Sequence, residues 1–211
     1  CAGLNDRDRA LLLQRYRDWS AEGFRVLGVA SRRLPRRAVF TAADERSASF
    51  QGFLLFFDPP KADIAATLAD LSRLGVRLKI ITGDNRFVAV SLAQRIGLPH
   101  PVVLSGSELR QIDDAALWHR AVHTDLFVEV DPNQKERIIR ALRTSGDVIG
   151  YMGDGINDAP ALMAADVGIS VETAVDVSKE AADLVLLERD LGVLSQGIAQ
   201  GRATFANTMK F

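Results

Sequence analysis

Two carboxylates and an amide are grouped in one short glycine-rich stretch, Gly153-Asp154-Gly155-Ile156-Asn157-Asp158. The stretch follows an apolar run over residues 148–152, which is typical of a strand, so Asp154 and Asp158 should emerge where this strand ends. Oxygen ligands of this kind suit Mg²⁺, which keeps several waters in its shell. We therefore expect Asp154 and Asp158 to form a magnesium site. The alternative is an ordinary strand-to-helix turn with Asp-Gly chemistry and an acidic helix start.

Three further polar stretches precede this one along the chain. They are Asp58-Pro59-Pro60-Lys61, then Ile81-Thr82-Gly83-Asp84, then Asp131-Pro132-Asn133-Gln134-Lys135. Together with the acidic stretch, and in this order, they resemble the motifs of the P-type cation-transporting ATPases, which are members of the haloacid dehalogenase superfamily. The resemblance extends to residues 201–207, and within the superfamily it is closest to the bacterial magnesium-transporting ATPases.

The resemblance implies a role for each of these residues. Asp154 would coordinate Mg²⁺ directly, while Asn157 and Asp158 complete the shell and position the phosphorylated residue. Thr82 and Gly83 would bind the phosphoryl group through a hydroxyl and a backbone N–H, with Asp84 opening the next helix. Asp84 could also act only as a cap of that helix, and a helix N-terminus is itself an anion site.

Cationic residues complete the expected site. Lys135 would contact the phosphate, since a compact ammonium can follow charge that spreads over the phosphoryl oxygens; the alternative is a solvated lysine on a basic helix. Arg25 resembles an arginine that contacts the phosphates of ATP, although an exposed strand arginine is equally compatible with its setting. Asp58 opens the stretch that looks like the junction between the nucleotide-binding and phosphorylation domains, and we place it in the nucleotide site. The second proline there, Pro60, can start the following helix.

The nucleophile that the family uses is absent from the sequence. That aspartate lies in an Asp-Lys-Thr-Gly-Thr segment, and no such string occurs here. Because aspartyl-phosphate chemistry needs its nucleophile, we expect the chain alone not to be phosphorylated or to turn over ATP. The sequence also begins with Cys1 rather than Met, so we expect an excerpt of a longer protein.

The elements that must position these residues alternate from Asp58 onward. Helical periodicity is expected over 61–74, 86–96, 113–122, 133–144, 175–181 and 191 to the end, with strands over 76–81, 102–104, 126–130, 148–152, 167–171 and 184–187. This pattern predicts an α/β fold with a doubly wound parallel sheet, which binds ligands beyond the carboxyl ends of its strands. Thr82, Lys135 and Asp154 should therefore converge on one rim.

Before Asp58, a helix over 5–21 and strands over 24–30 and 53–57 predict a truncated α+β nucleotide-binding lobe. The expected domains are 1–57, the end of the nucleotide-binding domain; 58–190, a phosphorylation domain without its nucleophile strand; and 191–211, a stalk helix leading to the membrane.

Composition and charge limit the classes of partner. The net charge of −1 gives no case for nucleic acid or for an anionic membrane surface. Residues 1–57 hold 10 arginines and 6 acidic residues, whereas residues 58–211 hold 16 basic and 21 acidic residues, which suggests a basic lobe facing phosphates and an acidic lobe holding metal. No apolar run approaches 18 residues, so we expect a soluble segment that does not cross a membrane by itself.

The resemblance implies the cytosolic catalytic segment of an ATP-driven pump that imports magnesium, at the cytoplasmic face of the inner membrane. ATP, Mg²⁺, an actuator domain and membrane helices would be its partners. Two alternatives stay open: a soluble haloacid-dehalogenase-type phosphatase acting on a small phosphoester, and a non-catalytic module that binds Mg²⁺ or nucleotide.

Overall fold

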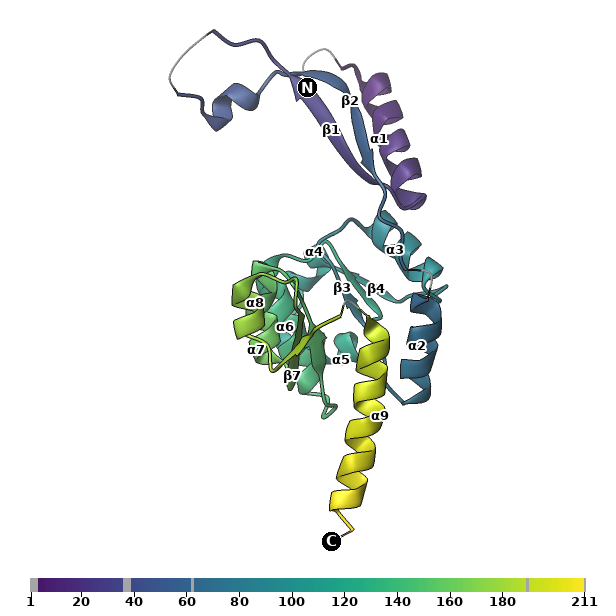
Figure 1. Ribbon diagram of the computed structural model, residues 1–211. Coiled ribbons are helices and arrows are strands. Elements are labelled where there is room, and N and C mark those ends of the chain that lie inside the picture. The colour runs from purple at the N-terminus through teal and green to yellow at the C-terminus, as the bar shows by residue number, and fades with distance from the viewer. Residues whose placement is uncertain (1–3, 36–38, 62, 189, 211) are drawn as a thin grey trace.

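The computed structural model describes residues 4–35, 39–61, 63–188 and 190–210. A small lobe of one helix and two strands is followed by a larger α/β body and a long terminal helix, and the two described ends of the chain lie at opposite ends of the molecule (Figure 1). The helices are α1 (Asp6–Ala21), α2 (Ile64–Arg73), α3 (Arg86–Arg95), α4 (Gly106–Leu109), α5 (Asp114–His123), α6 (Pro132–Arg143), α7 (Ala159–Ala164), α8 (Asp176–Glu180) and α9 (Leu191–Thr208), with 3₁₀ turns η1 (Ala42–Glu45) and η2 (Ile156–Asp158). The strands are β1 (Arg25–Ser31), β2 (Ser49–Phe56), β3 (Ile80–Ile81), β4 (Val103–Ser105), β5 (Leu126–Val128), β6 (Gly150–Met152), β7 (Val167–Val171) and β8 (Leu184–Leu186).

The small lobe is a two-stranded antiparallel ribbon with one covering helix. β1 and β2 pair so that Gly28 lies opposite Phe53, and the ring of Trp19 from α1 meets Phe53 edge-on at 5.4 Å. Of the described residues of this lobe, only Val26 and Ser20 are buried. A two-stranded ribbon is at best marginally stable by itself, so α1 and the contacts with the body must hold it.

The α/β body confirms the expected parallel architecture, with its strands hydrogen-bonded in two sheets. One sheet has the order β3-β5-β4 and the other β6-β7-β8, and every pair in them is parallel. In the described part of the chain, β3 pairs only with β5 and β6 pairs only with β7. Each of these two strands therefore keeps one edge without a ladder.

Alternate side chains of β5 pack on opposite faces, as a doubly wound fold requires. Leu126 and Val128 join Ala89 and Ala93 of α3, whereas Phe127 lies in the core formed with α5 and α6. A second core joins Tyr151 of β6 to α6 and α7. Ile81 and Ile149 pack against the core that contains Phe127 and also against the core that contains Tyr151. Helices α5, α6 and α7 therefore cover the same face of both sheets.

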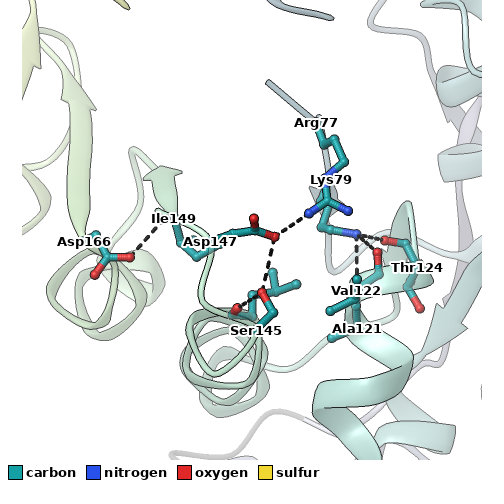
Figure 2. Close-up of polar contacts among 10 residues, drawn as sticks. Arg77, Lys79, Ala121, Val122, Thr124, Ser145, Asp147, Ile149 and Asp166 are labelled. Atoms are coloured by element: carbon teal, nitrogen blue, oxygen red, sulfur yellow. Dashed lines mark hydrogen bonds and ion pairs between the residues drawn. The ribbon is translucent and has the colours of Figure 1, made fainter. Parts of the chain in front are cut away.

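Polar contacts connect the two sheets at the amino ends of β3 and β6 (Figure 2). Arg77, before β3, reaches across to form an ion pair with Asp147, before β6. The Lys79 ammonium donates to the carbonyls of Ala121, Val122 and Thr124 at 2.6–3.0 Å, which ties β3 to the end of α5. Burial lowers the pKa of Lys79, the nearby Asp125 opposing this effect. The three carbonyls accept the hydrogen bonds that this ammonium would otherwise donate to water.

Three local expectations are corrected by the structure. Pro60 does not start a helix: α2 begins at Ile64 with Asp63 as N-cap. The strand expected over 76–81 is reduced to Ile80–Ile81, because β3 has a hydrogen-bonded neighbour on one side only, and that neighbour begins at Leu126. A short helix, α4, stands where none was expected; the capping box between Ser105 and Glu108 starts it.

The terminal helix α9 packs on α2 and then extends away from the body (Figure 1). The Arg202 guanidinium donates to the carbonyl of Leu74 at the end of α2. Residues 201–210 are all exposed. None of the helices that the described residues form has both the length and the apolar character of a membrane span.

Candidate active site

A carboxylate held by three donors is the centre of the site. One oxygen of Asp158, Oδ1, accepts a hydrogen bond from Lys135 Nζ at 2.7 Å and another from the Tyr151 hydroxyl at 2.6 Å. The other oxygen accepts from the backbone N–H of Gly155 at 3.1 Å. The side chains of Lys135 and Asp158 are only 17% and 11% exposed, so this pair is shielded from solvent screening.

Local sequence places the two partners. Asp131 caps α6, and its capping box with Gln134 fixes the first turn so that Lys135 follows directly. Gln134 is itself buried and donates to the carbonyl of Gly106. On the other side, a Cβ on Gly153 would lie 2.5 Å from the Cβ of Asp158, so only glycine lets this carboxylate fold back over the turn.

The hydrogen bonds decide the charge of the central residues. Burial raises the pKa of the Asp158 carboxyl, but hydrogen bonds from Lys135, Tyr151 and Gly155 outweigh it, and the net effect lowers this pKa below its ordinary value. Burial raises the pKa of the Tyr151 phenol, and the hydrogen bond to Asp158 raises it further. At neutral pH the site therefore holds an ionised Asp158 and a neutral Tyr151.

The threonine loop follows β3 at the carboxyl end of its sheet. The N–H of Thr82 donates to the carbonyl of Phe127 at 2.9 Å, and its own carbonyl accepts from Val130 N–H at 3.1 Å. Its hydroxyl oxygen accepts from the N–H of Asp84 at 3.1 Å. A Cβ on Gly83 would lie 3.4 Å from the carbonyl oxygen of Val130, a close approach that glycine permits.

The helix after this loop, α3, begins at Arg86 as expected, but its cap is a different residue. Asn85, not Asp84, caps α3, and its side chain accepts from Val88 N–H at 3.0 Å. Asp84 instead forms an ion pair with Arg25 of β1. Asp84 therefore neither opens α3 nor caps it, and both expectations are wrong, because the neighbouring Asn85 caps this helix.

Arg25 and Asp84 line a cavity between the small lobe and the body. Its volume is about 400 Å³, and its walls include Asp58, Phe57 and Arg95. The structure thus brings Arg25, Asp58 and Asp84, which were singled out from the sequence, to one cavity. Lys135 and Asp158 form the second group, described above.

Asp154 and Asn157 lie exposed at the turn after β6, and the carbonyl of Asp154 accepts the N–H of Val175 at 3.2 Å. The part of the chain that the structure describes contains no group of three His, Cys, Asp or Glu side chains placed to hold a metal ion. Mg²⁺ needs no such cage, because it is commonly bound by one or two carboxylates together with waters and substrate phosphate. An exposed Asp154 near an ionised Asp158 fits that requirement.

Tyr151 is the residue that sequence reasoning missed. It lies within the apolar run before the acidic turn, where it was counted only as a strand residue. A polar signal was present, since a buried tyrosine hydroxyl usually finds a hydrogen-bond partner. Its partner, Asp158, could be identified only from the structure.

Comparison with known proteins gives a consistent result. A model of the haloacid dehalogenase-like hydrolase family matches residues 6–166. The chain is 46% identical over 191 residues, 90% of its length, to the magnesium-transporting ATPase, P-type 1, of Escherichia coli K12, and 41% identical over 211 residues to one from Salmonella typhimurium LT2. It is 32% identical over 210 residues to calcium-transporting ATPase 1 of Bacillus cereus. These matches cover 21%, 23% and 24% of the three relatives, so the chain spans about a fifth to a quarter of their length.

Proposed function

This chain belongs to the haloacid dehalogenase-like hydrolase family, and on that premise we propose that it is the catalytic segment of a P-type pump that uses ATP to move magnesium. In this proposal residues 1–57 close the nucleotide-binding domain, residues 58–190 form the phosphorylation domain, and residues 191–211 begin the connection to the membrane helices on the cytoplasmic side. An actuator domain and the membrane helices would be its partners in the whole protein.

The observation that carries the proposal is the contact between Lys135 and Asp158. Lys135 follows β5 of one sheet and Asp158 follows β6 of the other, so the carboxyl ends of both sheets meet at one rim. Thr82 follows β3, which is parallel to β5, and therefore lies at the same end of its sheet. A hydroxyl, an ammonium and carboxylates at the carboxyl ends of parallel strands suit a phosphoryl group with its metal ion.

Each side chain then has a task in phosphoryl transfer. The Thr82 hydroxyl and the Gly83 N–H hold the phosphoryl oxygens, and Lys135 neutralises charge that develops on them. Asp84 and Asn157 orient the neighbouring loops, while Asp154 and Asp158 would hold Mg²⁺. That ion, when bound, would supply positive charge that offsets the charge of the phosphoryl group. Arg25 and Asp58 face the nucleotide from the cavity between lobe and body.

The open edges of β3 and β6 support a missing strand between them. Both sheets share a helical face through Ile81 and Ile149, and Arg77 and Asp147 bridge them at the amino end (Figure 2). One extended segment parallel to both strands would join the halves into a continuous sheet. Its carboxyl end would emerge between Thr82 and Asp154, where the phosphorylated aspartate is needed. In this proposal the nucleophile belongs to that segment, so the 211-residue chain by itself should be inactive.

Magnesium is favoured over calcium as the transported ion by degree of similarity. The magnesium-transporting relatives are 41–46% identical to the chain, and the calcium-transporting relatives are 32–34% identical. Identity is the support for this choice, since the residues of an ion path belong to the membrane helices of the whole protein.

Phosphoenzyme formation tests the proposal. The whole protein incubated with γ-labelled ATP should form an acid-stable, hydroxylamine-sensitive phosphoenzyme that is lost in Asp154→Asn and in Lys135→Met. The 211-residue chain alone should neither be labelled nor hydrolyse p-nitrophenyl phosphate. Mg²⁺-dependent turnover by the chain alone, abolished in Asp154→Ala, would instead establish the soluble phosphatase.

A further inference from the structure

We propose that Arg95 is a positioning residue that fixes the angle between the small lobe and the α/β body, and so holds Arg25 against Asp84 of the threonine loop. This inference rests on the proposed function for the role of Arg25. It concerns the last residue of α3, where this helix meets the base of the small lobe.

Arg95 contacts two segments at the base of the small lobe, the end of α1 and the end of β2. Its Nη2 atom donates to the carbonyl oxygen of Glu22, the C-cap of α1, at 2.5 Å. Its guanidinium carbon lies 5.1 Å from the ring centroid of Phe57, which directly follows β2. The Phe57 ring also packs on Phe24, with centroids 5.2 Å apart. One side chain of the body thus engages the end of the lobe's helix and the end of its second strand.

The backbone between these contacts is shaped to admit Arg95. Gly23 has φ +96°, a left-handed conformation that favours glycine. A Cβ at this position would lie 3.1 Å from Ser91 Oγ and 3.2 Å from Arg95 Nη2, both on α3. The absence of a side chain at Gly23 therefore permits the approach of α1 to α3 on which the hydrogen bond depends.

Two arginines cross the junction in opposite directions. Arg95 reaches from the body to the lobe, and Arg25 reaches from the lobe to Asp84 in the body. Both line the cavity of about 400 Å³, at whose edge the chain passes from lobe to body through Asp58. The Arg25 ion pair is partly exposed, with side chains 62% and 30% accessible, so solvent screening weakens it.

The two arginines have different partners, which gives them separate roles. A phosphate that approaches the cavity can draw Arg25 away from Asp84, since both partners are accessible to solvent. The lobe would then depend on Arg95 to keep its orientation, because the contacts of Arg95 with the Glu22 carbonyl and the Phe57 ring join lobe and body without Asp84. Preorganisation of this kind raises affinity by reducing the entropy lost on binding.

The test uses the 211-residue chain with Arg95→Ala, and Arg73→Ala as the matched control. Arg73 is also a helical, exposed arginine with an ion-pair partner, Asp70, so the charge change is the same. Residual dipolar couplings of backbone N–H groups report the orientation of residues 5–57 relative to 64–187. Calorimetric titration measures the affinity of the cavity for pyrophosphate. Arg25→Ala is the reference variant, because it removes the arginine that would contact the anion directly.

We expect Arg95→Ala to reduce the alignment shared by lobe and body and to weaken pyrophosphate binding about tenfold, with Arg73→Ala equal to wild type. Unchanged relative orientation in Arg95→Ala would overturn the inference, even if pyrophosphate binding fell, because Arg95 would then be a direct ligand. A third result is that Arg95→Ala loses the shared orientation while the wild type does not bind pyrophosphate. This result would reject the proposed nucleotide site and support the positioning role of Arg95.

Discussion

The Lys135 ammonium and the Asp158 carboxylate lie 2.7 Å apart, although the two residues are 23 positions apart in the chain. Both side chains are largely buried, and Tyr151 shares the oxygen that Lys135 contacts. A pair in this setting affects stability as well as chemistry, because removal of either charge leaves the other without its partner.

Asp158→Asn should therefore destabilise the folded chain. We expect the free energy of unfolding to fall by about 3 kcal/mol, since Lys135 would lose its counter-ion while still mostly buried. Urea denaturation monitored by circular dichroism measures the change. Asp70→Asn removes an exposed ion pair with Arg73 and should change the same quantity by less than about 1 kcal/mol. Equal effects of the two substitutions would show that the buried network contributes nothing.

The acid dependence of stability should follow Asp158. Its pKa is lower in the folded chain than in the unfolded chain, so its contribution is complete above the ordinary aspartate pKa of about 3.9. The contribution is lost as pH falls through the lowered folded pKa. The stability difference between wild type and Asp158→Asn should thus be constant from pH 7 to about pH 5 and shrink below about pH 4. A difference that grows on acidification would contradict the direction of this shift.

Magnesium binding should depend on Asp154 without loss of fold. Because Asp154 is exposed, Asp154→Asn is expected to leave the free energy of unfolding within about 0.5 kcal/mol of wild type. Calorimetric titration with MgCl₂ should give weak, saturable binding for wild type and none for the variant. Indistinguishable isotherms would remove Asp154 from the metal site. Asp176→Asn, another exposed aspartate, is the control for general charge effects.

Gly23→Ala should lower the free energy of unfolding by about 1–2 kcal/mol, because alanine is strained at positive φ and its Cβ would press on Ser91 and Arg95. Gly197→Ala is the matched control: this glycine lies in α9, and a Cβ added there would meet no heavy atom of the described residues within 4 Å. Alanine there should be neutral or stabilise by up to about 1 kcal/mol, as helix propensity predicts. Chemical denaturation of both variants decides; a Gly23→Ala protein as stable as wild type would mean that the junction relaxes freely.

The small lobe should open more readily than the body. Among the residues that the structure describes within 5–57, only Val26 and Ser20 are buried, and Leu27, Leu54 and Phe56 are about half exposed. Native-state hydrogen exchange should therefore show β1 and β2 exchanging faster than β5, whose three residues are fully buried. The opposite order, with β1 and β2 as the best-protected strands, would contradict this expectation.

The architecture was largely predictable because each element carries its own signal. The period of apolar residues predicted most helices and strands of the α/β body, and the motif order predicted the family. Boundaries were less accurate where tertiary contacts decide them. β3 is short because a neighbour is present on one edge only, which no feature of residues 76–79 indicates.

The site was predictable in its residue types and less so in its contacts. Thr82, Lys135 and Asp158 carry motif signals, whereas Tyr151 belongs to an apolar run and joins Asp158 only because the turn at Gly153 folds back. Arg95 carries no motif signal either. Its partners, Glu22 and Phe57, are 73 and 38 positions away, and long-range contacts of this kind depend on how the two parts of the chain dock.

The open edges of β3 and β6 also have a consequence for handling the protein at high concentration. Within the described residues, each strand presents backbone donors and acceptors that no ladder satisfies. Such edges are templates on which a strand from another molecule can add, a common route to aggregation. The open edges of β3 and β6 therefore expose the protein to intermolecular strand pairing when its concentration is high.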